Sequence, residues 1–282
     1  MPKPNPANPK PILKVKNDIV FRIFFADERN AEELMAFLKS VIRLPDDDYE
    51  SMEILDPNLL IDYDGDKTAV IDVKLRTKSR KIIHIEIQLR VAPEMRKRII
   101  FYISKLITEQ IKSGDDYYKI EKVISIIITD EKLINDSPKY HHRFTFNDPD
   151  ANIELTDLTE IHTIELSKLP EITDGTPLYD WAKFINAETE EELNMAAERN
   201  PQIKKAVIKL VELSADEKAR DRAERLEKSR RDFNMFMRRE RAEGEAAKAF
   251  AVARNAIDIG LDTETIIKLT NLTPAEIDAL RG

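Results

Sequence analysis

The chain has 282 residues, 42% of them hydrophobic, which is enough to bury one large core and still form a second, smaller unit. It has no cysteine, which excludes disulfides and thiolate metal sites and favours a reducing compartment. The net charge of −8 argues against extensive wrapping of nucleic acid, although a local basic patch can still bind it.

We expect the N-terminal region to carry no export signal. Residues 1–14 alternate proline, asparagine and lysine without the apolar stretch of a signal peptide, and we expect them to form a disordered or polyproline-like arm. No apolar run in the chain approaches the roughly 18 residues that cross a membrane. We therefore expect a soluble, cytoplasmic protein with no membrane partner.

The next segments predict two helices and a strand. Apolar residues follow helical spacing from Asn17 to Ile42, with a break at residues 27–30, so two helices should precede Pro45. A strand is expected over residues 51–63, and the Asp64–Gly65 pair that follows it signals a turn.

Residues 69–73 and 82–89 alternate as strands do, and the polar residues 77–81 between them predict a hairpin turn. If the loop holds residues 78–80, Asp72 lies opposite Glu86, with the two Cβ atoms roughly 5 Å apart. Because side chains alternate along a strand, the isoleucines of the second strand point into a core. The opposite face then carries Asp72, Lys74, His84, Glu86 and Gln88.

The two facing carboxylates have two interpretations. They are either the polar, water-facing side of an antiparallel pair or a pair that shares a cation. Acidic residues are poor strand formers, and like charges placed opposite each other destabilise a sheet. A hard divalent metal ion between Asp72 and Glu86 would remove that cost.

The remaining segments complete an α/β core and then become helical. Pro93 should open a helix that runs to about Ser113, and residues 123–129 predict a strand buried on both faces. Short strand-like stretches between residues 139 and 169 should extend or edge the sheet. From Tyr179 onward the pattern is helical, with a long charged helix over residues 216–243. A helix from Ala246 to Ile259 and two short helices should follow.

Several of these segments together resemble the recombination-promoting nucleases, a transposase-associated branch of the PD-(D/E)XK nuclease superfamily. The resemblance extends over most of the chain, and no single motif carries it alone. It rests on residues 17–25, 71–74, 85–89, 96–98, 101–102, 114–118 and 253–280.

The resemblance implies a mixed central sheet flanked by helices, the restriction-endonuclease-like core of the superfamily, over residues 15–170. A helical region over residues 171–245 and a small helical segment over residues 246–282 would follow. It also implies an endonuclease that hydrolyses DNA with Mg²⁺, for which Mn²⁺ may be substituted, in recombination or the movement of mobile elements. By position, Asp72, Glu86 and the carbonyl of Ile87 would hold the metal.

The resemblance further assigns roles around that centre. Gln88 stands where the wider superfamily has lysine, and an amide can orient water or phosphate but cannot supply a positive charge. Lys74 is either the replacement for that charge or a solvated lysine. Asp18 is either an acid that approaches the metal or a first-turn carboxylate that complements the helix dipole. Arg96, Arg98 and Tyr102 either grip the DNA backbone or form an ordinary basic helix face.

Two further expectations concern the whole protein. Cutting both DNA strands at once needs two active sites, so a homodimer formed through the C-terminal helices is expected. One alternative to an enzyme is a degenerate nuclease fold that acts as a DNA-binding or scaffold protein. Another is a helical oligomerisation protein whose N-terminal domain is passive.

Overall fold

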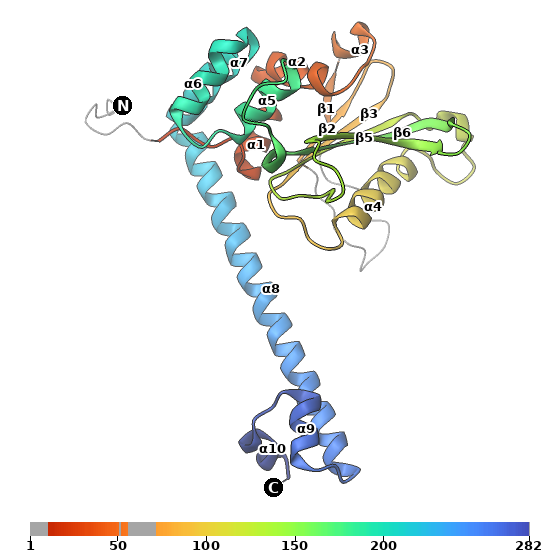
Figure 1. The fold of residues 1–282 in the computed structure, drawn as a ribbon, viewed down its shortest axis with the longest axis vertical. Coiled ribbons are helices and arrows are strands. Elements are labelled where there is room, and N and C mark those ends of the chain that lie inside the picture. The colour runs from red at the N-terminus through yellow and green to blue at the C-terminus, as the bar shows by residue number, and fades with distance from the viewer. Residues whose placement is uncertain (1–10, 51, 56–71, 282) are drawn as a thin grey trace. The chain divides into compact units, whose positions relative to one another are not determined.

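A computed structural model of the protein describes residues 11–50, 52–55 and 72–281 (Figure 1). The chain forms two compact units, Met1–Ala223 and Glu224–Gly282. Most of the expected N-terminal arm, most of the strand expected over residues 51–63 and the first residues of the hairpin lie outside the described residues.

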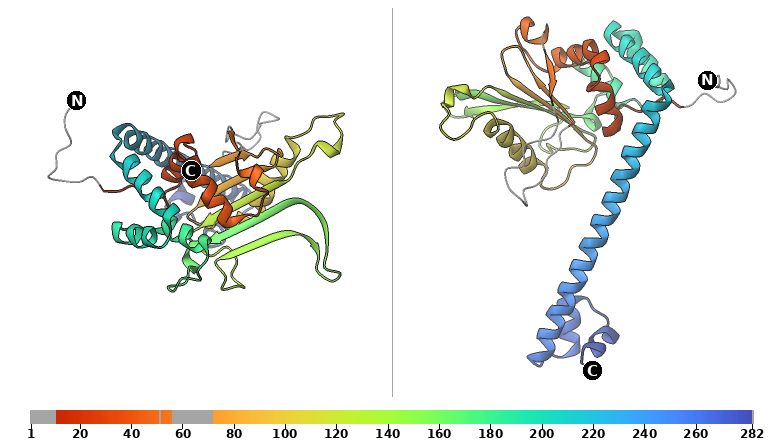
Figure 2. Two further views of the ribbon diagram at one scale, coloured as in Figure 1. Left: turned by 90° about the horizontal axis from the view of Figure 1, so that it is seen from above. Right: turned by 180° about the vertical axis from the view of Figure 1, so that it is seen from behind.

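A six-stranded mixed sheet forms the centre of the first unit. Its strands lie in the order β1-β2-β3-β4-β6-β5, with β3, β4 and β6 parallel and the other neighbours antiparallel. The β5–β6 hairpin forms one edge of this sheet (Figure 2). The strands are β1 (Glu53–Leu55), β2 (Val73–Arg76), β3 (Ile82–Gln88), β4 (Val123–Thr129), β5 (His141–Asp148) and β6 (Ile153–Glu165).

Helices cover both faces of the sheet, which confirms the expected fold class. One core cluster joins the sheet to the helices before β1 and after β6, and a second cluster joins the opposite face to α4 and the loop after β4 (Figure 1). The helices of this unit are α1 (Asp18–Phe25), α2 (Ala31–Val41), α3 (Asp46–Glu50), α4 (Met95–Thr108), α5 (Pro177–Asn186), α6 (Glu190–Arg199) and α7 (Pro201–Ala215).

The alternation of β3 divides its side chains between the two faces. Ile83, Ile85 and Ile87 are buried in the first core cluster, as predicted. There they share the core with an aromatic group in which the rings of Phe25 and Trp181 lie 6.2 Å apart. Burying each such aliphatic side chain contributes roughly 1.5–3 kcal/mol, so this face anchors the sheet. The even-numbered residues of β3 face α4.

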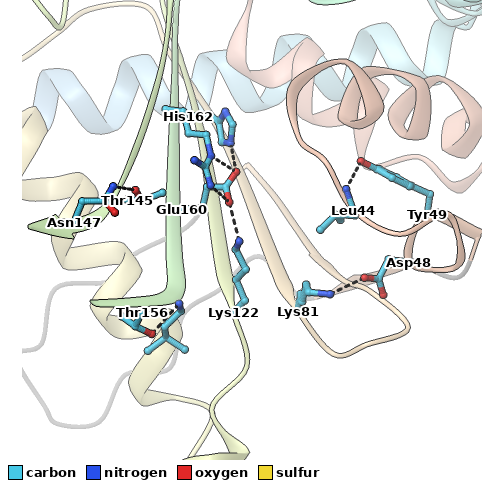
Figure 3. Close-up of polar contacts among 12 residues, drawn as sticks. Leu44, Asp48, Tyr49, Lys81, Lys122, Thr145, Asn147, Thr156, Glu160 and His162 are labelled. Carbon is cyan, nitrogen blue, oxygen red and sulfur yellow. Dashed lines mark hydrogen bonds and ion pairs between the residues drawn. The ribbon is translucent and has the colours of Figure 1, made fainter. Parts of the chain in front are cut away.

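The β2–β3 hairpin has the predicted register. Val73 pairs with Ile85, and the backbone N–H of Thr77 donates to the carbonyl of Lys81 at 3.0 Å. Asp48, in the short helix α3, which the sequence did not predict, locks the turn through Ser79 and Lys81 (Figure 3). These hydrogen bonds tie α3 to the β2–β3 turn.

Two helices differ from their predicted lengths. α4 ends at Thr108, before the predicted end at Ser113, because the side chain of Gln110 bonds both the Leu106 carbonyl and the backbone of Glu121 and turns the chain toward β4. Gly114 lies in that turn with φ +90°. The predicted charged helix and the one after it are a single helix, α8 (Glu217–Asp258).

Two short helices, α9 (Thr263–Thr270) and α10 (Pro274–Arg281), complete the second unit as predicted. The Asp262 carboxylate caps α9 by accepting from the N–H of Thr265. Ala253 and Ala256 of α8 pack with Ile266 and Ile277 in a small core that belongs to the second unit. Within the described residues, no helix is long and apolar enough to cross a membrane.

A buried ion network joins β4, β5 and β6. Glu160 accepts hydrogen bonds from Lys122, Arg143 and His162, which hold the pKa of its carboxyl far below the ordinary range even though burial opposes this (Figure 3). The imidazole of His162 also bonds that of His141 at 2.9 Å. This network provides partners for Glu160 and His162, whereas Thr163 and both ring nitrogens of His142 are buried without a hydrogen-bond partner among the described residues.

Candidate active site

Asp72 lies just before the first residue of β2, where the β2–β3 ladder ends. Its carboxylate accepts a hydrogen bond from the backbone N–H of Ile87 at 2.8 Å. The carboxylate of Asp72 therefore serves as the hydrogen-bond acceptor for β3 where the backbone ladder ends, and this bond holds the side chain beside Glu86.

Asp72 sits in an environment that disfavours its charge. Burial is the main cause, the negative charges of Glu86 and Asp18 add to it, and together they raise the pKa of Asp72 to about 7. The N–H of Ile87 and the charge of Arg22 act in the opposite direction. Acids from α1, the start of β2 and β3 thus act on one another at one end of the hairpin. Asp18 is the first residue of α1, and its negative charge acts on Asp72.

Glu86 is buried on the α4 side of β3, with 3% of its surface exposed. Its Oε1 accepts a hydrogen bond from Nη2 of Arg98 at 2.5 Å. Its Oε2 is buried and has no hydrogen-bond partner among the described residues. Burial raises the pKa of Glu86, and the charge of Arg98 partly offsets this. One carboxylate oxygen therefore lacks the partner that a buried charge requires.

His84 does not neutralise that oxygen. Its Nε2 lies 3.7 Å from Oε2 of Glu86, too far for a hydrogen bond. Burial, with the charges of Arg98 and Lys74, lowers the pKa of His84 to about 3, so the imidazole is uncharged at neutral pH. Its Nδ1 bonds the hydroxyl of Ser125. His84 is thus a fully buried core side chain.

The donor set fits a hard divalent cation. Two buried carboxylates with raised pKa values lie near each other, and the Oε2 atom of Glu86 lacks a partner. Mg²⁺ is commonly held by one or two carboxylates together with water and substrate phosphate. Among the described residues, no group of three or more histidine, aspartate or glutamate side chains is arranged for a metal. An ion here would thus depend on few protein ligands.

Arg98 brings Gln88 and Tyr102 to the same place. Its Nη1 donates to Oε1 of Gln88 at 3.3 Å, and its Nε donates to the hydroxyl of Tyr102 at 2.9 Å. The guanidinium carbon lies 5.1 Å from the centre of the Tyr102 ring. The two α4 residues lie together as their spacing predicted, but the contacts with β3 were not predicted. They depend on how α4 crosses the sheet.

Two other predicted site residues are engaged elsewhere. Lys74 shares the face of Glu86, yet its ammonium group forms an ion pair with Glu109 just after α4. Arg96 donates to the backbone carbonyl of Leu133, with the shorter contact at 2.8 Å, and so holds the loop that follows β4. Glu109 was missed by the sequence reasoning because its position depends on where α4 ends.

Comparison with known families agrees with this architecture. Residues 15–240 match the family described as PD-(D/E)XK nuclease family transposase. Comparisons with curated proteins and with solved structures give no match. The match extends from α1 through the sheet into α8 and includes every acid of the candidate site. This match, together with the mixed sheet flanked by helices, shows that the chain belongs to the PD-(D/E)XK nuclease family transposases.

Proposed function

We propose that this protein is a metal-dependent DNA endonuclease that acts in recombination or in the movement of mobile elements, with the expected nuclease domain over residues 15–170 as its catalytic part. The observation that carries the proposal is the partnerless Oε2 of Glu86 beside a second buried acid, Asp72. Membership of a nuclease family supports DNA as the substrate.

Asp72 and Glu86, with the carbonyl of Ile87, would hold Mg²⁺ or Mn²⁺. The bound ion would polarise the scissile phosphate and activate a water molecule for attack. Asp72 keeps its orientation through the N–H of Ile87, and Glu86 keeps its own through Arg98. Asp18 adds negative charge near Asp72, which strengthens the attraction for a cation.

The test is nicking of supercoiled plasmid by the purified protein with Mg²⁺, with Mn²⁺ and with EDTA. We expect cleavage with either metal and none with EDTA. Glu86→Gln and Asp72→Asn keep the side-chain shape and should each reduce the rate at least 100-fold. Asp150→Asn, in the exposed turn between β5 and β6, is the matched control and should cleave normally.

Two results would contradict the proposal. If both variants cut as fast as the wild type, the site is wrongly assigned. If the wild type does not cut DNA with either metal but still shifts DNA in a gel, the degenerate DNA-binding alternative replaces the nuclease.

We also propose that the protein acts as a homodimer joined through its C-terminal helices in the cytoplasm. α8 exposes large apolar side chains, including Leu226 and Met235, along a strongly charged helix. Sedimentation analysis of the full chain should give twice the mass of one chain, whereas a chain ending at Ala223 should be monomeric. An equal number of copies in both would refute this interface.

A further inference from the structure

Position 88 of the candidate site is a glutamine, whose amide supplies no positive charge. A phosphoryl group carries its greatest negative charge in the transition state, where fixed positive groups contribute most to the rate. The structure places one guanidinium against both Gln88 and Glu86, that of Arg98.

We propose that Arg98 is the catalytic cation of this nuclease and that Gln88 is the positioning residue that holds it. This inference rests on the proposed function. Water attacks phosphorus, the bond from phosphorus to the leaving sugar oxygen breaks, and that oxygen takes up a proton from solvent while the attacking water releases one. Arg98 stays protonated throughout and contacts the non-bridging phosphate oxygens.

The geometry of Arg98 suits this role. Its side chain is 40% exposed, whereas that of Glu86 is 5% exposed, so Arg98 is the more accessible partner of this ion pair. Contacts with Glu86, Gln88 and Tyr102 hold it from three sides. Within the described residues, these contacts use three of the five N–H donors of a guanidinium, and a phosphate accepts two such donors side by side.

Lys74, which also lies on the face of Glu86, is unsuited to the role. Its ammonium group is paired with Glu109, and the two side chains are 9% and 14% exposed. Moving Lys74 to a phosphate would leave the Glu109 carboxylate buried without its partner, which is strongly unfavourable. Arg98 needs no such separation, because its side chain is 40% exposed and its contacts with Glu86, Gln88 and Tyr102 use three of its five N–H donors.

Gln88 is matched to an arginine in this position. Its amide oxygen accepts from Nη1, and it adds no charge beside the guanidinium. A lysine at position 88 would place a second positive charge against Arg98. The glutamine and the arginine therefore form one functional pair. Substituting each alone and both together separates the effect of the positive charge from the effect of side-chain shape.

The experiment measures single-turnover cleavage of a DNA duplex with Mg²⁺ for Arg98→Ala, Gln88→Lys and the double variant, with Lys97→Ala as control. Lys97 is an exposed lysine next to Arg98 on α4. We expect Arg98→Ala to be slower by about 10²–10³-fold, as for loss of one transition-state donor. Gln88→Lys alone should be slower than wild type, but in the Arg98→Ala background it should restore the rate at least tenfold. Lys97→Ala should cleave normally.

A second readout does not depend on cleavage. Mn²⁺ binding to the DNA-free protein, measured by calorimetry, should become at least threefold tighter in Arg98→Ala, because the positive charge beside Glu86 no longer repels the ion. Arg98→Lys keeps the charge and should cleave faster than Arg98→Ala, which separates loss of charge from loss of folding.

The outcomes are distinct. Cleavage by Arg98→Ala within threefold of wild type, a loss that lysine at position 88 does not relieve, or unchanged Mn²⁺ affinity would each overturn this inference while leaving the nuclease assignment intact. A wild-type protein that neither cleaves DNA nor binds Mn²⁺ would instead overturn the proposed function.

Discussion

The buried acid Asp72 makes a quantitative prediction about stability. Its pKa is raised from the ordinary 3.8 to about 7, chiefly by burial. The folded protein therefore binds this proton more tightly than the unfolded chain does. Stability should be highest below pH 3.8 with respect to this group and should fall as the pH rises through 7.

The size of the effect follows from the shift. About three pKa units correspond to roughly 4 kcal/mol of unfolding free energy, which is an upper figure because a buried site relaxes when it ionises. Asp72→Asn removes the charge and retains an oxygen that can accept the N–H of Ile87. The metal-free variant should thus be more stable than wild type by about 2–4 kcal/mol at pH 8 and equally stable near pH 4.

Urea unfolding in EDTA at pH 4 to 8 measures this difference. Trp181 is the single tryptophan and lies in the core of the first unit, so its fluorescence reports on the unit that contains Asp72. Adding Mg²⁺ should stabilise wild type by about 1.4 kcal/mol when its concentration is ten times the dissociation constant, and should stabilise the variant much less. Asp150→Asn serves as the exposed control.

A stability difference that does not change with pH, or a variant less stable than wild type at pH 8, would refute the reasoning. Either result would mean that Asp72 is solvated or already paired with a cation. The burial argument for the metal site would then fail with it.

Three further predictions concern the fold. Hydrogen bonds from Lys81 and Ser79 outweigh burial and lower the pKa of Asp48 to about 2. Asp48→Asn should therefore reduce the free energy of unfolding by about 1–2 kcal/mol at pH 6. Urea titrations should show this deficit disappear as the pH falls from 3.8 through 2. Trp181→Ala should cost about 3–5 kcal/mol in calorimetry, and a loss under 1 kcal/mol would contradict its place in the core. Gly114→Ala should destabilise by about 1 kcal/mol because of its φ of +90°, whereas Gly244→Ala, within helix α8, should stabilise by about 0.5–1 kcal/mol in thermal melts; equal effects would refute the distinction.

Local patterns in the sequence determine much of this fold. The alternation of Ile83, Ile85 and Ile87 is enough to assign β3 and its core face, because side-chain direction in a strand depends only on neighbouring residues. The polar turn from Thr77 to Lys81 sets the hairpin register, which likewise depends only on residues that are neighbours in the sequence. The facing positions of Asp72 and Glu86 were therefore predictable without a structure.

Only the tertiary structure decided which partners these side chains meet. The contacts of Arg98 with Glu86, of Lys74 with Glu109 and of Arg96 with Leu133 join elements whose relative placement depends on the crossing of α4 over the sheet. That crossing is set by the packing of many side chains and by where α4 ends. Periodicity indicates which face a residue occupies, but the contact between two faces depends on the whole core that brings them together.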